Sequence, residues 1–300
     1  MAFYSAPSTQ AQKEAFKAAE DGHLDLLKEM LARTDVVKDH NTFVSQLRER
    51  RWSEMDGHDR QSVDLLYVNA ARGGHADTLR FLLDRYPYES TWLLGNFTFS
   101  EAIVHGSLET VRLTLDRWPD LVNANQAHSH GGTPLTTAIR ITWVAGARKL
   151  AYSMTELMLK RGADPNKPSS HGLPMEYALT SSWPELATLL IKHGAEPLPL
   201  EKELQLLPRA ARDGRLEAVS RLVDKGADLD SNTLDGPYSG TALLNAILGH
   251  HVHVAEYLIL AGADPGRRSL SGRSMLQVAA GSSASKDEMV QMLRGYGARE

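Results

Sequence analysis

A short pattern, Gly-Ala usually followed by an acidic residue, returns at nearly constant spacing through the second half of the chain. It first appears as Gly162-Ala163-Asp164, directly after an apolar run and a basic pair. Later copies begin at Gly194, Gly226, Gly262 and Gly297, so that successive glycines lie 32, 32, 36 and 35 residues apart. A fixed period of this length indicates a solenoid, in which one small helical unit is repeated and stacked. Each glycine is expected to end a helix, because glycine adopts the left-handed conformation freely.

The fronts of two units carry a second motif, Gly132-Thr133-Pro134-Leu135 and Gly240-Thr241-Ala242-Leu243. Together with the Gly-Ala-Asp tails, these motifs resemble ankyrin repeats, whose period is about 33 residues. The resemblance implies an all-α, ankyrin-like helix-turn-helix solenoid of about eight repeats with a concave groove. It identifies a scaffold and does not by itself identify a function.

Alignment from the helix start to the glycine predicts one elongated domain over 13–300, after an N-terminal segment at 1–12. The expected units are Lys13–Thr34, Leu65–Tyr86, Phe97–Trp118, Thr133–Gly162, Leu173–Gly194, Gln205–Gly226, Thr241–Gly262 and Ser274–Gly297. In each unit the first helix contains alanines where neighbouring helices must approach closely, such as Ala70-Ala71 and Ala210-Ala211. Small side chains at these points allow the units to stack.

Two insertions interrupt the repeat. Residues 35–64 add a polar, charged loop, and the fourth unit carries extra residues within 142–150 that include Trp143. Units two and three end in Tyr86-Pro87 and Trp118-Pro119, where proline excludes further helix. Both insertions are of a length that could roof the groove.

Composition narrows the class of protein. The formal net charge of −4 makes nucleic-acid binding unlikely, and the absence of cysteine excludes disulfides and thiolate chemistry. No apolar run is long enough to cross a membrane, so we expect a cytoplasmic or nuclear protein. Phosphate-binding and nucleophile-elbow motifs are absent, and no cofactor is expected. Histidines cluster at His250, His251 and His253 and at His128 and His130, but without the ligand spacing of a metal site, so no metal is predicted.

Helical spacing places one set of mostly polar side chains on the groove side of the first helices. The predicted binding residues are Asn69, Arg72, Glu101, His105, Thr137, Arg140, Trp143, Tyr177, Arg209, Arg212 and Asn245. Such positions either form a recognition surface or simply tolerate polar residues because water reaches them.

Within this set, Glu101 and His105 are four residues apart on one helix and could act as an acid–base pair with Tyr177. If Arg140 and Arg209 lined the same hollow, they could stabilise developing negative charge on a small substrate.

Two functions are therefore predicted from the sequence. The first is an interaction protein that binds a protein partner through the groove and loops, as the resemblance implies. The alternative is a small-molecule-binding protein or a metal-free, non-nucleotide enzyme of the lyase, isomerase or cyclase type, with the insertions as its roof.

Overall fold

A computed structural model describes residues 10–32, 63–85, 92–105, 107–124, 132–141, 147–170, 172–181, 183–232, 239–281 and 286–299. Most of the predicted 35–64 insertion, and Trp143, lie outside these residues. The chain divides into two compact units, Met1–Gly172 and Leu173–Glu300. The described parts contain helices, turns and two hairpins closed by isolated bridges, Ser169 to Gly172 and Arg268 to Ser274, and no strand. The predicted all-α class is confirmed.

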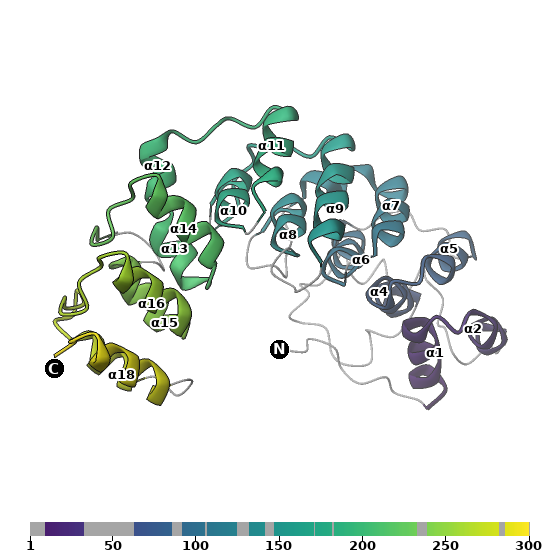
Figure 1. Ribbon diagram of the computed structural model, residues 1–300. Helices are drawn as coiled ribbons and strands as arrows, with labels where there is room; N and C mark the ends of the chain where they lie inside the picture. Colours follow the sequence, from purple (N-terminus) through teal and green to yellow (C-terminus); the bar gives the residue numbers. More distant parts are fainter. Residues whose placement is uncertain are drawn as a thin grey trace. The chain divides into compact units, whose positions relative to one another are not determined.

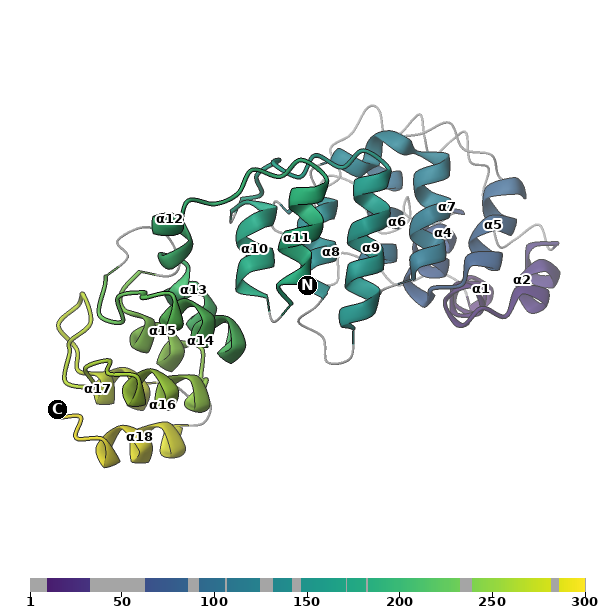
Figure 2. The same cartoon turned by 45° about the horizontal axis from the view of Figure 1, so that its top comes forward.

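The first unit is built from helix pairs arranged in two layers (Figures 1 and 2). In the layer of first helices, α1 packs on α4, α4 on α6 and α6 on α8, while in the second layer α5 packs on α7 and α7 on α9. The elements are α1 (Gln10–Asp21), α2 (Leu24–Leu31), α4 (Val63–Gly73), α5 (Ala76–Arg85), α6 (Trp92–Val104), α7 (Leu108–Arg117), the 3-10 helix η2 (Pro119–Asn123), α8 (Pro134–Arg140) and α9 (Arg148–Lys160).

The second unit repeats this arrangement. Among its first helices α13 packs on α15 and α15 on α17, and among its second helices α14 packs on α16 and α16 on α18. The elements are α10 (Pro174–Thr180), α11 (Glu185–Lys192), α12 (Leu200–Leu204), α13 (Leu207–Arg212), α14 (Leu216–Asp224), α15 (Ala242–Leu248), α16 (Val252–Leu260), α17 (Met275–Ala280) and α18 (Lys286–Gly295).

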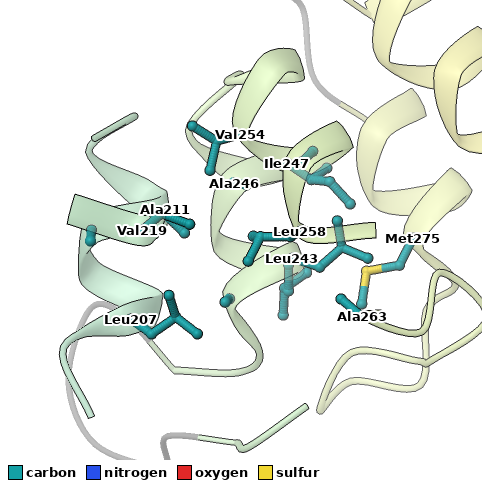
Figure 3. Close-up of a cluster of buried hydrophobic side chains, with 14 of the residues drawn as sticks. Leu207, Ala211, Val219, Leu243, Ala246, Ile247, Val254, Leu258, Ala263 and Met275 are labelled. Carbon is teal, nitrogen blue, oxygen red and sulfur yellow. The ribbon is translucent and has the colours of Figure 1, made fainter. Parts of the chain in front are cut away.

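Small and branched apolar side chains fill the space between successive helix pairs (Figure 3). Ala211 and Ala246 are fully buried where α13 meets α15, and Leu243, Ile247 and Leu258 fill the centre of the cluster at 1% exposure or less. Burying a large aliphatic side chain of this kind contributes about 1.5–3 kcal/mol. The predicted close approach at the alanines is confirmed, since Ala70, Ala71 and Ala210 are also fully buried.

The Gly-Ala pairs end the second helices as predicted. Gly162 has φ +89°, its N–H donates to the carbonyl of Leu159 at 3.1 Å, and the N–H of Ala163 donates to Met158 at 3.0 Å. These two bonds satisfy carbonyls that the end of α9 would otherwise leave open. Positive φ and the same pair of bonds recur at Gly194, Gly226, Gly262 and Gly297.

Hydroxyl side chains start several first helices. Thr133 caps α8 by accepting from Thr136 N, Thr241 caps α15 by accepting from Leu244 N, and Ser274 caps α17. A side-chain oxygen at this position satisfies an N–H of the first turn and is worth about 1 kcal/mol. The front motifs recognised in the sequence are therefore helix caps.

The structure also explains the repeats that depart from the common pattern, the third with its Trp-Pro ending and the fourth with its insertion. Trp118 ends α7 with φ −133°, Pro119 begins η2, and the tryptophan side chain is only 6% exposed. A Cβ on Gly95 of α6 would lie 3.3 Å from the Trp118 ring, so the glycine makes room for it. In the fourth repeat, Thr133–Gly162, the insertion partly lengthens the second helix, since α9 has 13 residues and α7 has 10.

Substitutions at two glycines, Gly226 and Gly214, distinguish the cost of a left-handed backbone from the cost of a steric clash. Gly226 has φ +89° in open space, whereas Gly214 has φ +69° and a Cβ there would lie 2.5 Å from His251 Nδ1. We expect Gly226→Ala to lower the free energy of unfolding by about 1 kcal/mol through the left-handed conformation alone. Gly214→Ala should lower it by about 3 kcal/mol, because overpacking is added.

The measurement is chemical denaturation of the full chain. Gly295→Ala serves as the control, since this glycine is in α18, lacks a positive φ and has open space around it. Its free energy of unfolding should stay the same or rise by about 0.5–1 kcal/mol. Equal losses for Gly214→Ala and Gly226→Ala would contradict the packing described at the α13–α14 turn.

Candidate functional site

In the first unit, a charged network links two neighbouring first helices. Arg72, at the end of α4, donates through Nε to Glu101 Oε2 of α6 at 3.0 Å. His105 Nε2 lies 3.2 Å from the same oxygen, one turn along the chain. The predicted Glu101–His105 pair is thus brought together, and Arg72 joins it. Glu101 is half-buried and His105 is exposed at 43% of its side chain, so the imidazole is open to solvent.

Two predicted residues, Asn69 and Arg140, and Val104, which is outside the predicted set, lie on the same first helices as this network or on their neighbour in the layer. Val104, between Glu101 and His105, is 55% exposed, and Arg140 at the end of α8 is exposed. Asn69, one turn before Arg72, is half-buried. Because α4, α6 and α8 are consecutive neighbours, we group these residues under one name, the first-helix face: Asn69, Arg72, Glu101, Val104, His105 and Arg140.

In the second unit, predicted groove residues form a buried cluster. The Arg209 guanidinium of α13 lies over the Tyr177 ring of α10 at 4.0 Å, and its Nη1 donates to Glu176 Oε2 at 3.2 Å. Tyr177 and Arg209 are each only 4% exposed. Glu176 also accepts from the N–H of Leu173, which caps α10. The cluster therefore joins two helix pairs and presents almost no surface.

Two further predicted residues serve the backbone. Asn245 of α15 is fully buried, and its side-chain amide donates to the carbonyls of Thr241 at 3.1 Å and Ser239 at 3.4 Å. The Thr137 hydroxyl donates to the carbonyl of Thr133 at 3.1 Å. These positions lie near the helix starts and are buried, while positions one turn later, such as Arg140, stay exposed.

An imidazole from the next helix pair packs against the backbone of the turn after α13. Arg212 is half-buried, and the His251 ring of the next helix pair makes a hydrogen bond to the Arg212 backbone. Burial is the main effect on the pKa of His251 and lowers it, opposed by that hydrogen bond and reinforced by His253, Arg215 and His250. A similar contact occurs in the first unit, where His75 lies against Gly22 and Gly73. His251 therefore binds the backbone of the preceding helix pair.

The predicted catalytic set is divided. Glu101 and His105 belong to the first unit, whereas Tyr177 belongs to the second and is buried under Arg209. Surface hollows among the described residues include one of about 180 Å³ at Asp116 and Arg161 and one of about 440 Å³ at Leu216 and Arg221. None of the predicted catalytic residues lines either hollow. Within the described ranges, no group of three or more His, Asp or Glu side chains is arranged to hold a metal ion.

Two important contacts were not foreseen from the sequence. Asn123 of η2 donates to Gly162 O and accepts from Asp164 N, both at 2.8 Å, and so ties the third repeat to the fourth. Arg221 of α14 donates to Leu179 O at 3.2 Å and Ser181 O at 2.7 Å. The Asn123 contact has a counterpart later in the chain, where Asp230 accepts from the N–H of Asp264. Asp164 and Asp264 both stand in Gly-Ala-Asp motifs, and this recurrence is a signal that the sequence offered.

The buried arginine can be tested against an exposed one. Arg209→Met removes the ion pair with Glu176 and the stacking on Tyr177, so the free energy of unfolding should fall by about 2–3 kcal/mol. Arg209→Lys keeps the charge but not the planar group and should recover only part of this loss.

Arg80→Met is the matched control, since Arg80 pairs with Asp77 and Glu109 at 49% exposure and should change stability by about 0.5 kcal/mol or less. Equal losses in urea denaturation would show that burial of the Arg209 pair is unimportant.

The His251 contact predicts a pH dependence. Because the folded-state pKa lies below the ordinary value of 6.5, the unfolded chain binds more protons as the pH falls. The contribution of neutral His251 is therefore fully present above that value and is lost as the pH falls below it. The difference in free energy of unfolding between the natural chain and His251→Asn should shrink from pH 8 to about pH 5. Using this difference cancels the histidines that do not interact with His251, and a difference that grows on acidification would contradict the assignment.

Comparison with known proteins agrees with the repeat architecture. A family model described as ankyrin repeats (many copies) matches residues 207–259. The human mitochondrial disaggregase is 35% identical over 101 residues, which is 34% of this chain and 13% of that protein. The ankyrin repeat protein nuc-2 of Neurospora crassa is 28% identical over 180 residues, or 59% of this chain and 16% of its own length. The chain thus spans a small part of these curated relatives.

Among solved structures, the human ASB11 ankyrin repeat domain aligns with a TM-score of 0.47 at 23% identity, over 78% of this chain and 98% of that one. None of the described helices is long and apolar enough to span a lipid bilayer. The stacked helix pairs, the recurrent glycine stops and the family model matched over residues 207–259 show that the chain contains ankyrin repeats, which generally mediate protein–protein interaction.

Proposed function

We propose that this chain binds a protein partner through the first-helix face of its first unit. The observation that carries the proposal is the network of Arg72, Glu101 and His105, which crosses from α4 to α6 and stays accessible to solvent. A charged network confined to stabilising the fold would be expected to lie deeper, as Arg209 does at 4% exposure.

The surroundings of the network support recognition of a protein. Val104 exposes 55% of its surface between two charged side chains, and Arg140 is exposed on the next helix. Arginine is frequent among the residues that contribute most of the binding energy in protein interfaces, and the buried centre of an interface is more apolar than its polar rim. The first-helix face combines these features on three neighbouring helices.

The sequence-based alternative of a small-molecule site or enzyme receives no such support. Its tyrosine is buried beneath Arg209, and the Glu101–His105 pair lies on an exposed helix end rather than in a described hollow. A general acid or base needs a bound substrate within hydrogen-bond distance. The acid–base pair is therefore interpreted as part of the binding surface.

The proposal is tested by placing a photo-crosslinking amino acid at Val104 in the full chain, expressed in its native cells. A discrete adduct is expected there, and the captured protein is identified by mass spectrometry. The same group at Arg112, which is exposed on the second-helix layer, should not give that adduct.

The identified partner then allows an affinity measurement. Arg140→Ala should weaken its binding by about ten-fold or more, equivalent to about 1.4 kcal/mol, as for an arginine near an interface centre. Arg112→Ala, the control on the opposite layer, should leave the Kd within about two-fold. Equal effects of both substitutions, or an adduct only at Arg112, would place the partner on another face.

A further inference from the structure

The segment that joins α16 to α17 is basic, although the chain as a whole is acidic. Residues 261–274 contain three arginines and one acidic residue, Asp264, while the formal net charge of the chain is −4. The arginines are Arg267, Arg268 and Arg273, and they lie on the hairpin formed by residues 266–273, which we call the basic hairpin. This hairpin is a cationic projection on an acidic protein.

Hydrogen bonds hold the basic hairpin in one conformation. Ser269 N donates to Arg273 O at 2.8 Å, and Arg273 N donates to Ser269 Oγ at 3.1 Å. Gly272, with φ +79°, closes the tip by donating to Ser269 O at 2.8 Å. A bridge between Arg268 and Ser274 fixes the base. Because the hairpin is ordered before any contact, a partner would lose little affinity to its ordering.

The chemistry differs between the base and the tip. At the base, Arg267 pairs with Asp230 at 3.7 Å. At the tip, Leu270 is 59% exposed, and Arg268 and Arg273 are exposed on either side of it. Arg268 Nη1 donates to Gly272 O at 3.0 Å, which holds the guanidinium beside the tip. Among the residues described, no carboxylate pairs with Arg273. The tip therefore offers positive charge next to an apolar side chain.

We propose that the basic hairpin docks an acidic segment of a protein partner, in which carboxylates flank an apolar side chain. The carboxylates bind Arg268 and Arg273, where guanidinium groups accept bidentate pairing, and the apolar side chain packs on Leu270. The inference rests on the proposed function, that this chain binds a protein, and adds the chemistry of the partner at a second surface.

A nucleic acid fits these observations less well. Its affinity comes from many phosphate contacts, and a chain of net charge −4 with two exposed arginines at one tip supplies few of them. An exposed leucine has no role in binding phosphate, whereas it buries apolar surface against a peptide.

The test uses short random peptides displayed on phage and selected on the immobilised full chain at physiological salt. The recovered pool should be enriched in Asp and Glu next to Leu, Ile or Phe. Recovery of these peptides should fall about ten-fold with Arg268→Gln plus Arg273→Gln, and also with Leu270→Ser, as for residues central to an interface. All three side chains are exposed, so the thermal midpoint should change little, although Arg268→Gln removes the hydrogen bond to Gly272 O. Lys192→Gln plus Arg294→Gln removes the same charge from exposed sites on α11 and α18 and should leave recovery unchanged.

Other results would overturn the inference. A pool without acidic enrichment, or equal recovery on the hairpin variants, would exclude the basic hairpin as the docking site. Peptides lost with Arg140→Ala but kept by the hairpin variants would overturn it while leaving the first-helix face as the binding surface. Binding of a poly(dT) strand that the hairpin variants abolish would assign the hairpin to nucleic acid instead.

Discussion

The structure depends on contacts between helix pairs that are each too small to bury their own apolar faces. Fully buried alanines, such as Ala70 in the first unit and Ala246 in the second, let neighbouring first helices approach until their larger side chains interlock. Leu243 and Ile247 of α15 then belong to one core with residues of α13 and α17. A larger side chain at either alanine would separate the helices, and the loss would be felt by the pairs on both sides.

The sequence predicted this architecture well because its signals repeat in phase. Gly162 and its later counterparts stop helices through the left-handed conformation, and Thr133 and Thr241 start them through capping bonds. One glycine alone would be a weak signal, but five at a common spacing identify the helix ends. The turns between the two helices of a pair are less regular. After α13 the left-handed position is filled by Gly214, whereas after α15 it is filled by His250, with φ 62°.

The candidate site was predicted less completely, for a geometric reason. Helical spacing gives the direction of a side chain around the helix but not how far along the axis neighbouring loops extend. Arg140, at the end of α8, is exposed, while Thr137, one turn earlier, is buried and bonds its own helix start. Asn123 and Arg221 contact backbone carbonyls of other repeats. Where those carbonyls lie in space is not revealed by the identity of either side chain.

Two arginines of the second unit, the buried Arg209 and the partly buried Arg221, act together on one helix. Arg209 of α13 reaches Glu176 in the first turn of α10, whose carboxylate also caps that helix, and Arg221 of α14 reaches the carbonyls of Leu179 and Ser181 at its end. A buried ion pair is seldom more stabilising than apolar side chains of the same size, because the desolvation of both charges opposes their attraction. Apolar contacts, however, tolerate sliding of one helix along another. Directed bonds from both helices of one pair to the two ends of α10 allow a single alignment, so we infer that these arginines set the register of the α13–α14 pair on α10 more than they add to its stability.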